Sequence, residues 1–244
     1  MKRVLLSISF DGTKYHGWQI QPNAVTVQEV LEDSLLKLLG KPTGVTSCSR
    51  TDAGVHAKEF YIHLDCEDSI PDCAFLKGLN AILPSDISVK CIKTVQNDFH
   101  ARYNARGKTY LYNIYNSSLK DAFLSRYSWH IDRPLDIDKM NIFCKSIIGT
   151  HDFFAFSSSG RSVEDTVRTV SDCYIEKCGD MLSLRITANG FLYNMVRIVV
   201  GTAVGVSDGK INVDDIPQII ADKNRDGLGI TAPPHGLFLE KVYY

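Results

Sequence analysis

The sequence shows no excess of charge of either sign. Its 27 lysine and arginine residues nearly balance 28 aspartate and glutamate residues, so the formal net charge at pH 7 is −1. A nucleic-acid-binding protein of this composition needs its basic side chains gathered on one face, because the total charge supplies no attraction. The stretch 99–133 has such a bias, although a solvated surface explains it equally well. Its basic residues, set against only two acids, are Arg102, Arg106, Lys108, Lys120, Arg126 and Arg133.

Several other features are missing. The seven cysteines are scattered and include no Cys-x-x-Cys pair, so neither a disulfide framework nor a zinc site is predicted. The longest apolar stretch, near 195–206, is too short to span a bilayer and contains Arg197. The apolar run after Lys2 and Arg3 is broken by polar residues too early for a signal peptide. We therefore expect a cytoplasmic protein without a membrane segment.

What is present is the composition of an ordinary globular protein, with 44% hydrophobic and 23% charged residues. In the first half, Thr26 and Glu29 form a capping box at the start of a helix that Gly40 ends. The predicted order is strand, helix, strand, strand, helix, strand, which is the ferredoxin-like arrangement. The corresponding ranges are 4–10, 27–39, 43–48, 60–64, 73–83 and 87–95.

The second half repeats this order. The predicted elements are a strand at 108–115, a helix at 136–148, a hairpin of 167–176 and 181–187, helices at 189–206 and 213–222, and a last strand at 237–243. The sequence thus predicts an α+β protein of two ferredoxin-like halves, 1–104 and 105–244. Antiparallel sheets would flank a central active-site cleft between the halves.

One short stretch concentrates groups that can perform chemistry. Residues 48–57 read Cys-Ser-Arg-Thr-Asp-Ala-Gly-Val-His-Ala, which places the carboxylate of Asp52 close to Arg50 and His56. Strand-forming residues lie on both sides, so Asp52 is expected on a loop held between strands, where reactive groups are often found. The alternative is that Asp-Ala-Gly is a turn whose aspartate bonds its own backbone.

Arg197 is the clearest physical anomaly. The helix expected around it is apolar on nearly all sides, which is typical of a buried helix. A buried guanidinium is costly unless a carboxylate answers it, and no acid lies at helical spacing, so the partner must come from elsewhere in the chain. Asn194 and Gly201 share its face, and the glycine would let another backbone approach. The alternative is an arginine whose head group reaches the surface.

Tyr110 lies on the strand expected at 108–115, where Lys108, Tyr110 and Tyr112 share one face. An aromatic ring at such a position is a sequence-tolerant platform for a nucleobase. A half-buried sheet surface also favours tyrosine, so the pattern alone leaves both interpretations open.

The stretch Arg-Thr-Asp-Ala-Gly-Val-His-Ala resembles the catalytic signature of the tRNA pseudouridine synthase A family. The segment Phe-Leu-Tyr-Asn-Met-Val-Arg at 191–197 and the Lys-x-Tyr pattern at 108–110 are similar to two further motifs of that family. Segments 17–21, 99–102 and 231–239 extend the resemblance over nearly the whole chain. Ser49 departs from the family, which usually has glycine there, and this affects the expected path of the loop.

The resemblance implies an isomerase that converts uridine to pseudouridine at positions 38, 39 and 40 of tRNA, without cofactor or metal. By this resemblance, Asp52 is the catalytic carboxylate and Arg197 pairs with Asp52. Tyr110 stacks on the target base and could assist proton transfer. Whether Asp52 attacks the base, traps the sugar or helps remove a ribose proton stays open. The expected substrate contacts are Tyr110, Arg50, His56, Arg102, Lys108 and Leu237. The family also implies a homodimer that binds tRNA and not DNA.

Two other classes of function compete with this one. A non-catalytic RNA-binding protein with RRM-like sheets would suit the ferredoxin-like order, and Arg106, Gly107 and Tyr110 partly fit an RNP1 pattern. It lacks the aromatic residue expected after the glycine and leaves Asp52 and Arg197 without a role. A metal-dependent nuclease would need clustered carboxylates, and no second acid accompanies Asp52.

Overall fold

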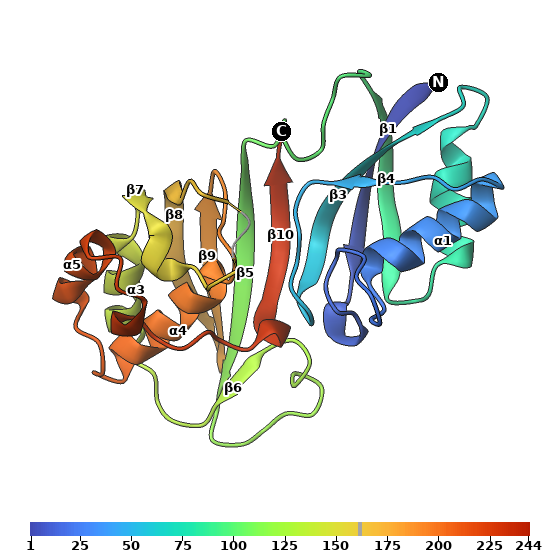
Figure 1. Cartoon of the computed structure of the whole chain (residues 1–244). Coiled ribbons are helices and arrows are strands. Elements are labelled where there is room, and N and C mark those ends of the chain that lie inside the picture. Colours follow the sequence, from blue (N-terminus) through green and yellow to red (C-terminus); the bar gives the residue numbers. More distant parts are fainter. Residues whose placement is uncertain (161–162) are drawn as a thin grey trace. The chain divides into compact units, whose positions relative to one another are not determined.

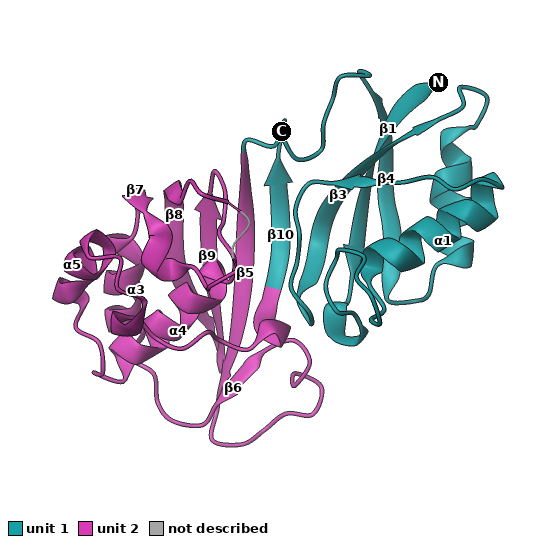
Figure 2. Ribbon diagram, in the orientation of Figure 1, with its two compact units in different colours: residues 1–106, 238–244 teal, residues 107–237 magenta. Residues whose placement is uncertain are grey.

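The computed structural model describes residues 1–160 and 163–244, and it has the predicted α+β composition (Figure 1). The chain divides into two compact units (Figure 2). Unit 1 contains residues 1–106 and 238–244, and unit 2 contains residues 107–237. Within the described residues, no helix combines the length and the apolar character needed to cross a membrane.

Unit 1 is built on an antiparallel sheet with β1 in its centre. Strand β1 pairs with β3 on one side and with β4 on the other, and Leu6 lies opposite both Ile62 and Ile92. The short β2 pairs with β3. The elements are β1 (Lys2–Phe10), α1 (Val27–Leu39), β2 (Thr46–Ser47), β3 (His56–Cys66), α2 (Asn80–Ile82) and β4 (Ile87–Val95).

Helix α1 forms where the capping signals predict it. The hydroxyl of Thr26 accepts a hydrogen bond from the backbone N–H of Glu29, and the Glu29 carboxylate accepts one from Thr26. Gly40 ends the helix in the left-handed conformation, with φ 70°. Leu31 and Leu35 are fully buried on the face that packs into the unit. The predicted helix at 73–83 is present, with π-helical geometry at 74–79 that continues into α2.

Unit 2 has its own antiparallel sheet in the order β5-β9-β8-β7, and β6 pairs in parallel with β5. Helix α3 packs against α4 and β8, and Phe143 and Val199 are fully buried. The elements are β5 (Gly107–Asn116), β6 (Trp129–Ile131), α3 (Ile137–Ser146), β7 (Gly149–Asp152), β8 (Val167–Cys178), β9 (Met181–Ala188), α4 (Met195–Ser207) and α5 (Ile216–Ala221).

The predictions for the helix after β9 and for the last strand need correction. Helix α4 begins at Met195, not at 189, because Asn194 has φ 62° and cannot continue a right-handed helix. The residues before it leave β9 in a loop that Asn189 ties back to Thr169 by two hydrogen bonds, of 3.0 and 3.1 Å. The last strand, β10 (Leu237–Tyr243), was expected in the second half. It groups with unit 1, where Phe238 and Leu239 pair in parallel with β3.

Candidate active site

Asp52 lies on the loop that joins β2 to β3, as the sequence predicts. Its backbone carbonyl accepts a hydrogen bond from Val55 at 3.2 Å, which closes a tight turn. This backbone bond fixes the position of Asp52 in the turn. The side chain is half-buried, so the carboxylate sits at the edge of the protein interior.

The N-terminal loop at 15–18 holds the Asp52 loop from one side. The backbone N–H of Trp18 donates to the carbonyl of Thr51 at 3.1 Å, and Gly54 donates to the carbonyl of Tyr15 at 3.2 Å. Gly17, with φ +87°, makes this approach possible, because a methyl group there would lie 2.4 Å from the Thr51 oxygen. Backbone contacts on both sides of Asp52 thus fix the path of its loop.

The same N-terminal loop is anchored to α1. Val27 donates to the carbonyl of Gly17 at 3.2 Å, and Gln28 donates to that of Trp18 at 3.0 Å. The Trp18 ring is only 2% exposed and packs on Phe60 with the ring centroids 4.4 Å apart. Trp18 is therefore a packing residue, and through it α1 and β3 support the Asp52 loop.

The two residues expected to flank Asp52 differ in their surroundings. Arg50 is exposed, which suits a contact with phosphate. His56 is 1% exposed, stacks on Phe238 and accepts a hydrogen bond at Nδ1 from the backbone of Gly12 at 3.0 Å. The same nitrogen lies 3.0 Å from a carboxylate oxygen of Asp11, a contact that is an ion pair only when His56 is protonated. The structure favours a packing role for His56.

Thr51, next to Asp52, has an unusual hydroxyl group. The side-chain oxygen is buried, and within residues 1–160 and 163–244 it has no hydrogen-bond partner. Leaving a buried hydroxyl unsatisfied costs about 1–3 kcal/mol. The loop that carries Asp52 therefore contains a local source of instability that the sequence does not indicate.

Arg197 lies in the first turn of α4 and is half-buried. Its Nε donates to the carbonyl of Ala232 at 2.7 Å, and its Nη1 donates to the side-chain oxygen of Asn194 at 2.8 Å. Asn194 is in turn held by a bond to the hydroxyl of Ser158 at 2.9 Å. These acceptors fix the plane of the guanidinium group. Of them, sequence spacing indicates only Asn194, three residues before Arg197.

The segment 228–232 runs against α4 and brings Ala232 to Arg197. Ala232 donates its backbone N–H to the carbonyl of Arg197 at 3.1 Å, and Gly229 donates to the hydroxyl of Thr202 at 3.1 Å. A methyl group at Gly201 would lie 1.7 Å from the carbonyl oxygen of Ile230. The expectation that Gly201 admits a second backbone is confirmed.

Tyr110 lies on β5 opposite Ile186 of β9 and is 6% exposed. The edge of its ring contacts Phe191, with the centroids 4.8 Å apart, so its orientation is set by packing. Two positions along, Tyr112 is fully buried and donates its hydroxyl to the carbonyl of Pro233 at 2.7 Å. Burial raises the pKa of Tyr112 well above its usual range, which keeps this donor protonated.

The remaining predicted contacts are distributed over both units. Lys108 lies at the start of β5 and is half-buried, and Leu237 at the start of β10 is 5% exposed. Arg102 is exposed on the segment after β4. Asp52, Arg50, His56 and Arg102 thus belong to unit 1, and Tyr110, Lys108, Arg197 and Leu237 belong to unit 2.

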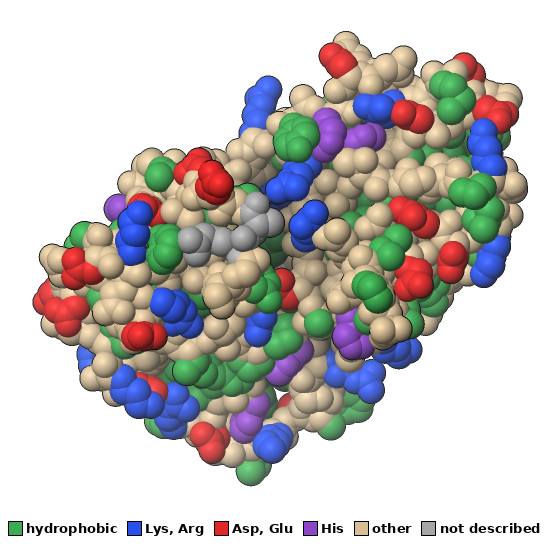
Figure 3. Space-filling model, in the orientation of Figure 1, with side chains coloured by type: hydrophobic (Ala, Val, Ile, Leu, Met, Phe, Trp, Pro, Cys, Tyr) green, Lys and Arg blue, Asp and Glu red, His purple; other side chains and the backbone are tan. Residues whose placement is uncertain are grey.

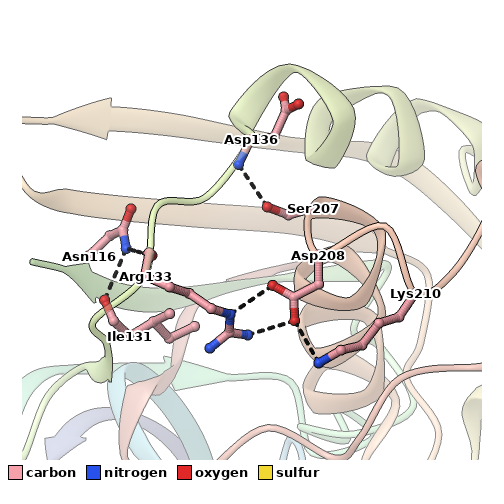
Figure 4. Close-up of polar contacts among 7 residues, drawn as sticks. All are labelled: Asn116, Ile131, Arg133, Asp136, Ser207, Asp208 and Lys210. Atoms are coloured by element: carbon pink, nitrogen blue, oxygen red, sulfur yellow. Dashed lines mark hydrogen bonds and ion pairs between the residues drawn. The ribbon is translucent and has the colours of Figure 1, made fainter.

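Not every basic residue of the stretch 99–133 is available to a ligand. Arg133 donates two hydrogen bonds of 2.8 Å to the carboxylate of Asp208, which also accepts one from Lys210 at 3.0 Å (Figure 4). The Arg133 guanidinium holds the pKa of Asp208 below its usual range. Arg133 therefore ties the end of β6 to the end of α4. On the face drawn in Figure 3, basic and acidic side chains are interspersed.

The described residues contain no group of three or more histidine, cysteine, aspartate or glutamate side chains arranged to bind a metal ion.

Comparisons with known proteins point to one family. A family model described as tRNA pseudouridine synthase matches residues 6–104 and 143–244. The tRNA pseudouridine synthase A of Thermoanaerobacter sp. (strain X514) is 47% identical over 244 residues, covering 100% of both chains. The proteins of the same name from Acetivibrio thermocellus and Ruminiclostridium cellulolyticum are 46% and 45% identical, also over 100% of both chains.

Proposed function

We propose, because this chain belongs to the tRNA pseudouridine synthase family, that it modifies uridines at positions 38, 39 and 40 in the anticodon stem and loop of tRNA. Family membership makes it an isomerase that forms pseudouridine in tRNA. The finer assignment to these positions comes from the family that its motifs resemble. A target base must leave its stack to react, which costs least in loops and at stem ends.

The reaction rearranges one nucleotide without a net change in composition. The bond from C1′ of the ribose to N1 breaks, the base turns, and C1′ bonds to C5. The hydrogen on C5 leaves as a proton, and N1 gains one. No electrons are exchanged with another molecule, so no redox cofactor is needed, and the resemblance to the family implies neither a cofactor nor a metal.

We assign the central role to the carboxylate of Asp52. It would add to the base, trap the sugar, or assist removal of a ribose proton, and these three routes stay open. The observation that carries this assignment is the half-buried Asp52 on a loop whose backbone is fixed on both sides by the N-terminal loop. The rate of such a reaction depends on where the catalytic carboxylate lies, so a fixed loop suits this role.

Arg197 and Tyr110 complete the proposed site. Arg197 would grip the carboxylate of Asp52, and its bonds to Asn194 and Ala232 support this role because they orient the guanidinium group. Tyr110 would stack on the target base, and its contact with Phe191 supports this because the ring is held in one orientation. Arg50, Arg102, Lys108 and Leu237 would contact the RNA around the target.

The finer features of the architecture are proposals as well. The order β4-β1-β3 with β2 on β3 supports a ferredoxin-like unit 1, and the order β5-β9-β8 supports one in unit 2. We propose that the two halves flank a central cleft. We also propose that the protein works in the cytoplasm as a homodimer in which one tRNA touches both subunits.

The test is tritium release from tRNA whose uridines carry tritium at C5. Wild-type protein should release tritium, and Asp52→Asn should release none while it still binds tRNA, because the substitution keeps the shape and loses the charge. Isomerisation by folded Asp52→Asn above a few per cent of wild type would refute the role of Asp52. Binding by the wild type without any tritium release would instead favour the non-catalytic RNA-binding alternative.

A second pair of variants tests the grip of Arg197. Arg197→Lys keeps the charge but loses the planar two-point contact, and misplacing a reacting group by about 1 Å can cost on the order of a hundredfold in rate. We expect Arg197→Lys and Arg197→Met to slow single-turnover isomerisation at saturating protein while tRNA binding changes less. Wild-type rates in both variants would show that Arg197 does not position Asp52.

A further inference from the structure

Tyr103 is a large aromatic residue on the surface of unit 1. Its side chain is 77% exposed, yet it is stacked on His100 with the ring centroids 4.1 Å apart and an angle of 29° between the planes. A ring that only extends into solvent needs no such support. One side of the Tyr103 ring is therefore covered by imidazole while most of the residue stays open to solvent.

The imidazole beneath Tyr103 is itself fixed. Nδ1 of His100 accepts backbone hydrogen bonds from Arg102 at 3.1 Å and Tyr103 at 3.3 Å. The edge of the His100 ring lies against His63, with the centroids 5.1 Å apart. Burial, with a contribution from the nearby Arg3, lowers the pKa of His63 to about 4. His63 is therefore neutral near pH 7, and its Nδ1 accepts a hydrogen bond from Ala101 at 3.0 Å.

The backbone that carries these rings is held at several points. The hydroxyl of Tyr244 donates to the carbonyl of Ala101 at 2.8 Å, and the N–H of Arg106 donates to the carbonyl of Tyr243 at 2.8 Å. Asn104 closes the turn by a bond to the carbonyl of His100 at 3.0 Å. Little conformational freedom remains for a ligand to remove, which favours binding.

The charge around Tyr103 is positive. Arg102 and Arg106 are exposed, and neither forms an ion pair in the part of the chain that the structure describes. The nearest acid in the sequence, Asp98, is exposed, and Asp65 lies on β3 two residues from His63. Both oxygens of Asp65 are bound by Arg3, at 2.7 and 2.8 Å.

We propose that His100, Arg102, Tyr103 and Arg106 form a docking platform for RNA, on which an unpaired base stacks against Tyr103 and the arginines contact the flanking phosphates. Proteins that bind single-stranded RNA commonly combine aromatic rings, on which bases stack, with a basic surface that follows the RNA backbone. A protein partner would favour a contiguous apolar patch, whereas the exposed neighbours of Tyr103 are polar or charged. This inference rests on the proposed function for the identity of the RNA as tRNA.

The test compares Tyr103→Ala with Tyr103→Phe, which keeps the ring. Affinity for tRNA and the single-turnover rate at saturating protein are measured for each. Tyr103→Ala should weaken binding about tenfold and leave the saturated rate unchanged, while Tyr103→Phe stays within about twofold of wild type. Arg102→Ala should lower the slope of the logarithm of the binding constant against the logarithm of salt concentration by about one, the value for one lost phosphate contact. Ile142→Ala, which truncates a 55% exposed apolar side chain on α3, is the matched control.

Each outcome decides the question. Equal tRNA affinity in Tyr103→Ala and Ile142→Ala overturns the platform and leaves the isomerase assignment standing. A change of molar mass in light scattering with unchanged RNA affinity also overturns it, and assigns the surface to a second copy of the chain. If the wild type binds tRNA through Tyr103 but releases no tritium, the isomerase assignment fails and the platform stands.

Discussion

Replacing Gly17 by alanine should slow the chemistry more than it destabilises the fold. Gly17 has φ +87°, and an alanine in the left-handed region costs about 1–2 kcal/mol. The new methyl group would also lie 2.4 Å from the carbonyl oxygen of Thr51 and 3.1 Å from the carbonyl carbon of Asp52. Reaching ordinary contact at 3.4 Å requires the Asp52 loop to move by about 1 Å.

The chain provides a matched control for the backbone strain alone. Gly40, at the end of α1, has φ +70°. Apart from its chain neighbours and the backbone of α1, no atom of the described residues lies within 4 Å of a methyl group built there. Gly40→Ala therefore carries a similar cost in backbone strain without displacing anything. Both variants should remain folded, because domains of this kind have about 5–15 kcal/mol of stability.

The assay is single-turnover tritium release at saturating protein, with unfolding by urea measured on the same samples. We expect a larger loss of stability in Gly17→Ala than in Gly40→Ala, because the clash with Thr51 adds to the backbone strain. The rate should stay near wild type in Gly40→Ala and fall on the order of a hundredfold in Gly17→Ala. A folded Gly17→Ala that reacts within twofold of Gly40→Ala would refute the idea that the N-terminal loop positions Asp52.

Two further predictions concern stability. Thr51→Val replaces a buried hydroxyl that lacks a partner among the described residues, and it should stabilise the fold by about 1 kcal/mol. Thr51→Ser, which keeps the hydroxyl and loses the methyl group, should destabilise it. A Thr51→Val variant less stable than wild type in urea unfolding would contradict this. Asp208→Asn should lose about 1 kcal/mol at pH 7, because it weakens the bonds to Arg133 and Lys210. Since folding lowers the pKa of Asp208, its contribution is present above the unfolded pKa and is lost as the pH falls below about 4. The difference between wild type and Asp208→Asn should therefore close in acid, and a difference as large at pH 3 as at pH 7 would exclude this explanation.

The elements that follow from local rules were predicted well from the sequence. The capping box of Thr26 and Glu29 and the terminal Gly40 place α1 within one residue, because all the groups involved lie in the helix itself. The strand 87–95 has the bounds of β4, and the hairpin turn falls at Gly179 and Asp180 between β8 and β9.

The errors occur where contacts with distant parts of the chain determine where a helix or strand begins. The apolar pattern after 189 suits a helix, but the bonds from Asn189 to Thr169 hold the chain on the neighbouring strand until Asn194 turns it. The β3 strand begins at His56, four residues earlier than the pattern indicates, and there it pairs with β10 from the other end of the sequence. Neither contact leaves a periodic signal in the local sequence.

The same division applies to the candidate site. The sequence picks out Asp52, Tyr110 and Arg197 through their motifs, and the i−3 spacing points to Asn194. It does not indicate the groups that orient them, because the carbonyl of Ala232 and the ring of Phe191 are not specified by spacing. A backbone acceptor can belong to any residue type, so the Ala232 contact in particular cannot be read from side-chain chemistry.

These orienting contacts bear on how the proposed site would work. The Asp52 loop is held within unit 1 by Gly17 and Trp18, and the guanidinium of Arg197 is held within unit 2 by Asn194 and Ala232. Each group is thus ordered by its own unit, so the entropy cost of ordering it is met during folding. If Asp52 and Arg197 pair as proposed, little of that cost remains when the RNA binds, and more of the binding free energy can stabilise the transition state.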